Sequence, residues 1–204
     1  KKKLSKVGEV ILNMDIESAR TWGLILCNLA YTAEFNWWIK NIKFNNTYSV
    51  DAIKDLLENE TDTSKTHIVS AFKNILISNP TLANEVGLGV CDYSLKGNKR
   101  YLNTVYRSEW NDPSPEVILY SLYKFAEACG DYKQFTLARL VDNDIDSDGV
   151  SPIEIFGIDK EKMTSLLKGL AVNYPDFINV SFTLDLDNIT LKEDKSSKDV
   201  LSLF

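Results

Sequence analysis

The sequence contains very few residues of the kinds that usually carry chemistry. Its 204 residues include one histidine, His67, and three cysteines, Cys27, Cys91 and Cys129. The cysteines are scattered and form no CxxC pair, so we expect no zinc or iron–sulfur site and a reducing, cytoplasmic setting. No GxSxG, HExxH or GxxxxGK(S/T) motif is present to build a nucleophile, a metalloprotease site or a phosphate loop. We therefore predict no catalytic residue, no cofactor and no metal.

Long hydrophobic runs are also missing. The longest apolar stretches, such as VILYSLYKFA, are too short to span a bilayer, so we expect no membrane partner. The basic start KKKLSK is followed by neither an adequate apolar run nor a small-residue cleavage site, and we expect no signal peptide. Because the chain begins with lysine rather than methionine, we interpret it as a fragment of a longer protein.

Charge is distributed unevenly along the chain. The formal net charge is −6, but residues 1–110 contain 14 Lys and Arg against 12 Asp and Glu, whereas residues 111–204 contain 9 against 17. An acidic protein is a poor non-specific binder of nucleic acid, so only the first half is a candidate site for a polyanion. The asymmetry predicts two modules, residues 1–110 and an acidic module at residues 111–204.

Three helices followed by a β-hairpin are expected in the first module. Asp15 or Ser18 could cap a long buried helix, and Ser49 could cap the second helix. Apolar spacing predicts the second and third helices, and β-prone runs around a KGNK reversal predict the hairpin. The segments concerned are TYSVDAIKDLLEN, SKTHIVSAFKNILI, VCDYSL and RYLNTVYR. This order is typical of a winged helix-turn-helix module.

The second module repeats the order. An apolar helix and a short second helix precede a helix capped by Asp159, and the alternating run FINVSFTL then turns back through ITL. Its hairpin carries Asp185 and Asp187 instead of lysines, which favours protein packing over DNA contact. The predicted fold class is therefore mainly α with small β-hairpins (α+β), arranged as tandem winged helix-turn-helix modules.

The first module contains the predicted nucleic-acid-binding residues. With Ile68 turned inward, the third helix should present its polar face, and the hairpin tip should present basic side chains. The predicted binding residues are Thr66, Ser70, Lys73, Asn74, Lys96, Lys99 and Arg100. We group Arg107 with these surface cations. Ordinary solvated side chains are the alternative interpretation of the same residues.

The segment DNDIDSDGVSPIEI looks like the start of a calcium-binding loop. With Asp144 as the first ligand, Asp146, Asp148 and the glycine that follows stand where an EF-hand needs them. The twelfth position, however, is Ile155 instead of a bidentate glutamate, and no second loop of this kind occurs. We expect a solvated acidic turn before a helix, with a cation site as the alternative.

Three longer stretches suggest a family. They are DIESARTWGLILCNLAY, VILYSLYKFAEACGDYKQFTLARLVDNDIDSDGVSPIEIFGIDKE and GLAVNYPDFINVSFTLDLDNITL. Together they cover about residues 15–204 and resemble the C-terminal region of large bacterial phosphoadenosine phosphosulfate (PAPS) reductase-like proteins, often encountered near DNA-modification and phage-defence genes. That family's catalytic domain has an SGGxDS-like phosphate loop, which this chain lacks. The resemblance implies an accessory region of a parent enzyme of sulfur or nucleotide chemistry.

These observations predict a non-catalytic accessory region that engages DNA through the first module, or a partner protein. The candidate protein partners are the catalytic domain of the parent protein and the product of a neighbouring gene. The alternative is a pure protein-interaction or dimerisation module without nucleic-acid binding, which would use the aromatic-rich first helices or the acidic second module. A calcium-responsive domain and an independent enzyme rank below both.

Overall fold

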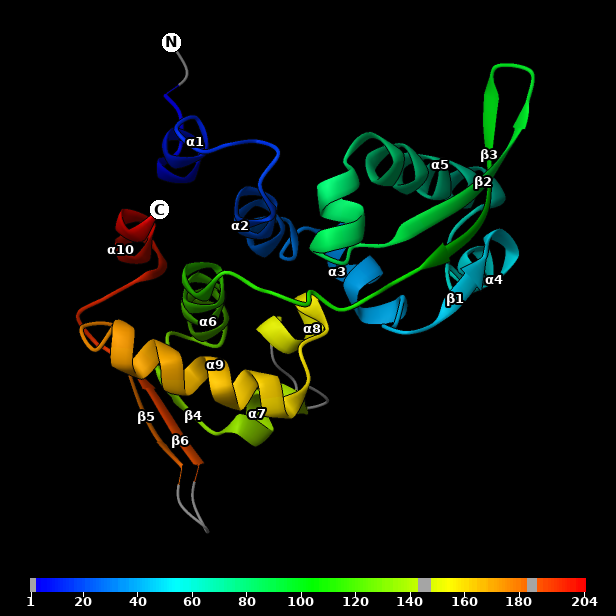
Figure 1. Cartoon of the computed structure of the whole chain (residues 1–204). Helices are drawn as coiled ribbons and strands as arrows, with labels where there is room; N and C mark the ends of the chain where they lie inside the picture. Colours follow the sequence, from blue (N-terminus) through cyan, green and yellow to red (C-terminus); the bar gives the residue numbers. More distant parts are fainter. Residues whose placement is uncertain (1–2, 143–147, 183–186) are drawn as a thin grey trace.

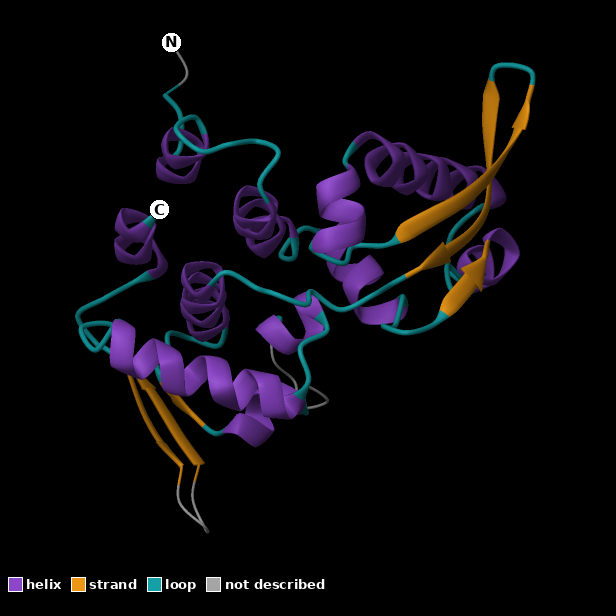
Figure 2. Ribbon diagram, viewed as in Figure 1, coloured by secondary structure: helices purple, strands orange, loops and turns teal. Residues whose placement is uncertain are grey.

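The structure is a computed structural model that describes residues 3–142, 148–182 and 187–204. Within these ranges it consists of many helices and two small antiparallel sheets of three strands each (Figures 1 and 2). The prediction of a mainly helical α+β fold is confirmed at this level. No helix in the described ranges combines the length and the apolar character that crossing a membrane would require.

The first half begins with three helices: α1 (Lys6–Ile11), α2 (Ala19–Leu29) and α3 (Ala33–Asn41). Ser18 is the N-cap of α2, and its hydroxyl accepts a hydrogen bond from the backbone N–H of Arg20 (3.2 Å). The helix expected from this cap forms over Ala19–Leu29, and α3 follows it as a separate helix that was not predicted. The Thr32 hydroxyl donates to the carbonyl of Leu29 (2.7 Å), and its extended backbone starts α3.

A sheet and two further helices complete this half. The elements are β1 (Thr47–Ser49), α4 (Val50–Asp55), α5 (Asp62–Ser78), the π-helical turn η1 (Thr81–Glu85), β2 (Val90–Lys96) and β3 (Lys99–Tyr106). All pairings are antiparallel, in the order β1-β3-β2. Gly97, with φ of 61°, makes the tight reversal between β2 and β3 that the sequence predicted. The three-residue strand β1 was not predicted.

The second half follows a similar order. Its elements are α6 (Pro115–Ala128), β4 (Gln134–Phe135), α7 (Leu137–Val141), α8 (Pro152–Phe156), α9 (Lys160–Asn173), β5 (Ile178–Phe182), β6 (Asp187–Leu191), α10 (Ser197–Val200) and the 3₁₀ turn η2 (Leu201–Leu203). The sheet order is β4-β6-β5, so in each half the last strand lies between the other two. Each half therefore has a helix, a strand, further helices and a hairpin in the same sequence.

The two halves share a continuous hydrophobic core. Helix α2 packs against α6, where Gly23 approaches Trp110 so closely that an added Cβ would lie 2.5 Å from the indole ring. The Tyr120 hydroxyl on α6 donates to the side-chain oxygen of Asn28 on α2 (2.9 Å). The division at residue 110 stays a prediction, and the packing across it ties the two halves together.

Candidate functional site

A hollow of about 480 Å³ lies between α4, α5 and β3 in the first half. Its lining residues are Val50, Lys54, Thr66, Val69, Ser70, Lys73, Lys99, Arg100, Tyr101 and Leu102. Five of the seven residues predicted from the sequence are among them. Asn74 is exposed further along α5, and Lys96 is exposed on the hairpin outside this lining. We call the lining residues together with Asn74 and Lys96 the cationic face.

Helix α5 supplies four of the lining residues, Thr66, Val69, Ser70 and Lys73, because its apolar side faces the core. Thr61 caps the helix by accepting from the backbone N–H of Ser64 (3.2 Å). Val69, Phe72 and Leu76 are buried, and the Phe72 ring stacks on Trp38 with centroids 4.0 Å apart. The sequence had centred this buried stripe on Ile68, which is only partly buried.

That rotation determines how far each predicted side chain reaches into solvent. Thr66 and Asn74 are exposed, whereas Ser70 and Lys73 are half-buried and line the hollow. The Lys73 ammonium donates to the backbone carbonyl of Arg100 on β3 (3.2 Å). This bond joins the hairpin to α5. Because an ammonium has three N–H groups, Lys73 keeps further donors for a ligand.

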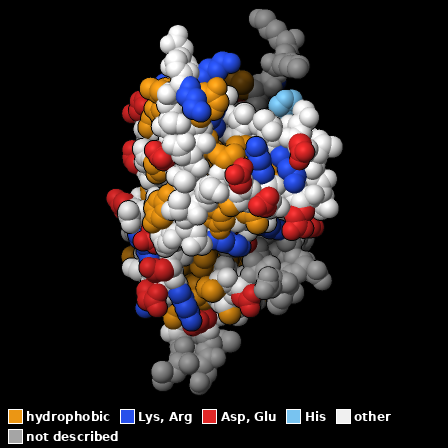
Figure 3. All heavy atoms as spheres, turned by 90° about the vertical axis from the view of Figure 1, so that its right-hand side faces the viewer, with side chains coloured by type: hydrophobic (Ala, Val, Ile, Leu, Met, Phe, Trp, Pro, Cys, Tyr) orange, Lys and Arg blue, Asp and Glu red, His pale blue; other side chains and the backbone are white. Residues whose placement is uncertain are grey.

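The hairpin holds its own cations over aromatic rings. The Arg100 guanidinium lies 5.5 Å from the centroid of Tyr93, and the Lys96 ammonium lies 5.4 Å from that of Tyr101. Such contacts restrain flexible basic side chains without neutralising them. The upper end of the face drawn in Figure 3 accordingly shows basic side chains next to hydrophobic ones.

Carboxylates are absent from the lining of this hollow. Among the described residues, the ion pairs within 4.0 Å are Arg20–Glu116, Lys124–Glu127, Lys133–Asp131 and Lys195–Asp194. None of these pairs involves α4, α5 or the β2–β3 hairpin. The positive charge of the cationic face is therefore not compensated by a salt bridge in the described part of the chain.

Sequence reasoning missed Lys54, which lines the hollow from α4. A lysine in the last turn of a helix is an ordinary sequence feature, and it gives no sign of which neighbour it will face. The orientation of α4 beside α5 places this side chain with the predicted cations.

Acidic side chains limit the cationic face on two sides. At the start of α5 a neighbouring hollow of about 430 Å³ is lined by Asp51, Asp55, Asp62 and Lys65, and it shares Lys54 and Thr66 with the cationic face. A further hollow of about 590 Å³, which includes Trp37 and the exposed His67, is lined by three glutamates, Glu34, Glu58 and Glu60. Within the described residues, the lysine- and arginine-lined hollow between α4, α5 and β3 is thus bordered by acidic side chains near the start of α5 and beside α3.

Arg107 does not belong to the cationic face, and its grouping with the surface cations was wrong. Its side chain is buried and donates to the carbonyls of Gly87 (3.1 Å), Ile42 (2.7 Å), Ile39 (3.2 Å) and Ile155 (3.1 Å). Burial lowers the pKa of this guanidinium to about 9, so it keeps its charge at neutral pH. It serves packing and cannot reach a phosphate.

Neither Cys27 nor Cys91 offers an activated thiol. Burial raises the pKa of Cys27 to about 12 and that of Cys91 to about 11. The nearby Lys73 charge opposes the second shift without cancelling it. Both thiols are therefore protonated at neutral pH, which suits packing rather than nucleophilic attack.

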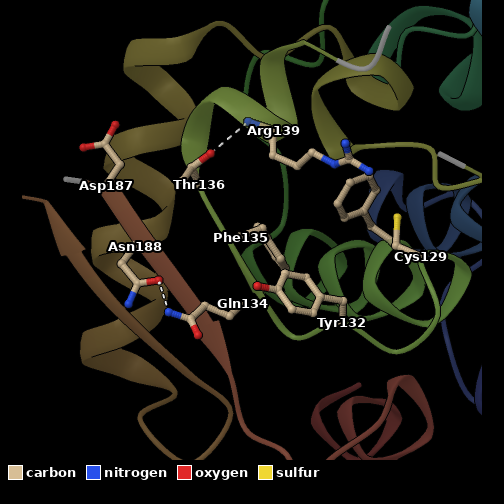
Figure 4. A pocket seen from close by; sticks show the side chains of 9 residues that line it. Cys129, Tyr132, Gln134, Phe135, Thr136, Arg139, Asp187 and Asn188 are labelled. Carbon is tan, nitrogen blue, oxygen red and sulfur yellow. Dashed lines mark hydrogen bonds between the residues drawn. The ribbon is translucent and has the colours of Figure 1, made fainter. Parts of the chain in front are cut away.

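The second half has a different hollow, of about 560 Å³ (Figure 4). Aromatic and uncharged polar side chains dominate its lining, which consists of Phe125, Cys129, Tyr132, Gln134, Phe135, Thr136, Arg139, Asp187 and Asn188. A bond from the Gln134 amide to the Asn188 oxygen (3.1 Å) joins β4 to β6. Only one arginine lines it, and Asp187 stands at its edge, so this hollow is no second cationic face.

The acidic loop falls partly outside the described residues. Asp144 and Asp146 lie in the range 143–147, so their placement as cation ligands is not addressed by the structure. Elsewhere in the described chain, no three His, Cys, Asp or Glu residues are grouped to hold a metal ion. Glu154 closes a capping box at the start of α8, where its carboxylate accepts from the backbone N–H of Ser151 (3.1 Å).

Comparisons of the chain with models of protein families, with curated proteins and with solved structures give no match. The resemblance to PAPS reductase-like proteins therefore stays a prediction. A functional proposal has to come from the geometry and charge of the cationic face.

Proposed function

We propose that this chain is a non-catalytic accessory region that binds duplex DNA through the cationic face, in the service of a larger PAPS reductase-like protein. One observation supports this above all: Lys54, Lys73, Lys99 and Arg100 converge on one hollow that has no carboxylate in its lining. In the described chain none of the four forms an ion pair within 4.0 Å, although Lys54 also lines the neighbouring acidic hollow. Cations grouped in this way suit a polyanion, because each phosphate contact releases counterions.

The order of elements in the first half also supports the proposal. Helix α3, strand β1, helices α4 and α5 and the β2–β3 hairpin follow one another as in a winged helix-turn-helix module, and the central position of β3 fits that topology. In such a module the recognition helix, which corresponds to α5 here, enters the major groove of the DNA, and the hairpin contacts the adjacent phosphate backbone. Thr66, Ser70 and Asn74 then face base edges, while the lysines and Arg100 contact phosphates.

The test is fluorescence anisotropy with a labelled duplex of about 20 base pairs, at about 50 mM and 200 mM salt. Binding should weaken at least tenfold between the two salt concentrations, as expected for several phosphate contacts. The double variant Lys73→Glu with Lys99→Glu should lose binding.

The matched control is Lys160→Glu with Lys168→Glu, which makes the same change in net charge on α9 in the second half. This control should bind nearly as the unchanged chain does. Absence of binding at the lower salt concentration, or equal losses in the two double variants, would contradict the proposal.

A protein-docking module is the second candidate, and the exposed apolar side chains of the hairpin favour it. Leu95 is 65% exposed and Tyr101 45% exposed. Sedimentation that shows a stable dimer, combined with no DNA binding, would select this candidate over the first.

A further inference from the structure

The β2–β3 hairpin projects from the body of the first half beyond α5 (Figure 1). Its projecting part mixes large apolar side chains with cations. Tyr93, Leu95 and Tyr101 are 38%, 65% and 45% exposed, and Leu95 pairs across the hairpin with Arg100. Lys96 and Lys99 face each other at the turn. Aromatic and aliphatic surface is therefore interleaved with positive charge.

Binding to duplex DNA alone does not explain why the hairpin exposes large apolar side chains. The grooves of a duplex offer phosphates and base edges, while the flat faces of the bases are covered by their neighbours in the stack. A hairpin that contacted only phosphates would need its lysines but would leave Tyr93 and Leu95 in water. Unpaired bases expose apolar faces that stack on such side chains, and their backbone supplies the phosphates that lysine and arginine bind.

We propose that the hairpin binds unpaired bases, so that the chain prefers DNA in which a duplex meets a single strand. This inference rests on the proposed function, because the cationic hollow on α5 would hold the duplex part. The Lys73–Arg100 bond (3.2 Å) fixes the hairpin beside α5, so the two surfaces are offered to one DNA molecule together.

Local contacts shape the part of the hairpin next to its body. A register shift between Asp92 and Tyr93 marks a bulge, which re-aims the side chains that follow it. Asn103 accepts from the Ser94 hydroxyl and donates to the Asp92 carboxylate, both at 3.2 Å. These bonds link the two strands across the bulge, and contacts that hold a binding element in shape reduce the ordering it undergoes on binding.

The interleaved cations distinguish a nucleic acid from an apolar protein partner. Lys96, Lys99 and Arg100 form no ion pair within the described chain, and three uncompensated charges at the hairpin turn disfavour a purely hydrophobic partner. The phosphates of a single strand neutralise them while its bases cover the rings.

Anisotropy with three DNA probes tests the inference. The probes are a blunt duplex of about 20 base pairs, the same duplex with an unpaired tail of about eight nucleotides, and that duplex with an abasic tail of equal length. The normal tail should improve affinity about tenfold over the blunt duplex, because stacking of one base on an aromatic side chain raises affinity by about fivefold or more. The abasic tail, which has no base to stack, should improve affinity by clearly less.

Leu95→Ser should reduce the advantage of the tailed probe and leave affinity for the blunt duplex within about twofold. Tyr93→Ala should reduce the same advantage, and because the Tyr93 ring lies beneath Arg100 this variant is judged by the ratio of tailed to blunt affinity alone. The matched controls are Val172→Ser on α9, where the valine is 79% exposed, and Tyr132→Ala, where the tyrosine is 65% exposed. Both controls should keep the full advantage, and circular dichroism should show all four variants folded.

The possible failures differ. Equal affinity for blunt and tailed probes, or an abasic tail as good as a normal one, overturns the inference and leaves duplex binding intact. If folded Leu95→Ser loses binding to both the blunt and the tailed probe, the inference is also overturned, because the hairpin would then contact duplex and single-stranded DNA alike. If no probe binds at low salt, the proposed function fails and the inference fails with it.

Discussion

The Arg107 guanidinium donates to the backbone carbonyl of Ile155 across 3.1 Å. Arg107 directly follows β3 in the first half, and Ile155 belongs to α8 in the second. The same guanidinium lies 3.8 Å from the centroid of the Phe44 ring, and it also donates to carbonyls of the first half. One buried side chain thus satisfies backbone acceptors from both halves.

We expect Arg107→Leu to lower the free energy of unfolding by at least about 3 kcal/mol, because it leaves four carbonyls without their donor and each unsatisfied buried group costs about 1–3 kcal/mol. Urea unfolding followed by circular dichroism measures the change. Arg100→Leu, at an exposed arginine, should change stability by less than about 1 kcal/mol. A loss below about 1 kcal/mol for Arg107→Leu would contradict this account.

Gly157 should tolerate no side chain. It ends α8 with φ of 68°, and an added Cβ would lie 2.5 Å from the Phe44 ring. Gly157→Ala is therefore expected to destabilise the protein by about 1–3 kcal/mol, through backbone strain and displacement of that ring. Gly169→Ala in the middle of α9, where no atom lies within 4 Å of the added Cβ, should instead stabilise by about 0.5–1 kcal/mol. Thermal melts of the two variants should shift in opposite directions.

Lys54→Ala tests the residue that sequence reasoning missed. If its ammonium contacts a phosphate, the slope of the logarithm of DNA affinity against the logarithm of salt concentration should become shallower by about 1. Lys160→Ala on α9 is the control and should leave the slope unchanged. An unchanged slope for Lys54→Ala would remove α4 from the DNA contact.

Stability should fall in alkaline solution because of the buried thiols. The pKa of Cys27 is raised to about 12 in the folded chain from an ordinary value of 9.0. Below pH 9 both states keep the proton and the contribution is fully present. Between about pH 9 and 12 only the unfolded chain loses it, which lowers the free energy of unfolding by up to about 1.4 kcal/mol per pH unit.

Urea unfolding of the unchanged chain and of Cys27→Ala at several pH values between 8 and about 11 isolates this contribution. The difference in stability between the two should shrink as pH rises. A constant difference across that range would show that the thiol does not titrate differently in the folded and unfolded states.

Local features were predictable from the sequence. Ser18, Ser49 and Asp159 each cap a helix as expected, and Gly97 makes the hairpin turn. A helix cap or a tight turn depends on atoms within about three residues along the chain, so the identity of the neighbouring residues is enough to predict it. The same reasoning predicted the third helix and the two strands that position most of the cationic face.

Tertiary packing decided the remaining features. The burial of Arg107, the convergence of Lys54 with Lys73 and the contact between α2 and α6 all join segments that are distant in the sequence. The sequence by itself determined several helix caps, the hairpin turn, most of the helices and strands around the cationic face, and where the basic residues occur. It did not determine the separate helix α3 or the short strand β1. Which cations face solvent and which are buried was settled only when those segments packed, because burial depends on neighbours that the local sequence does not contain.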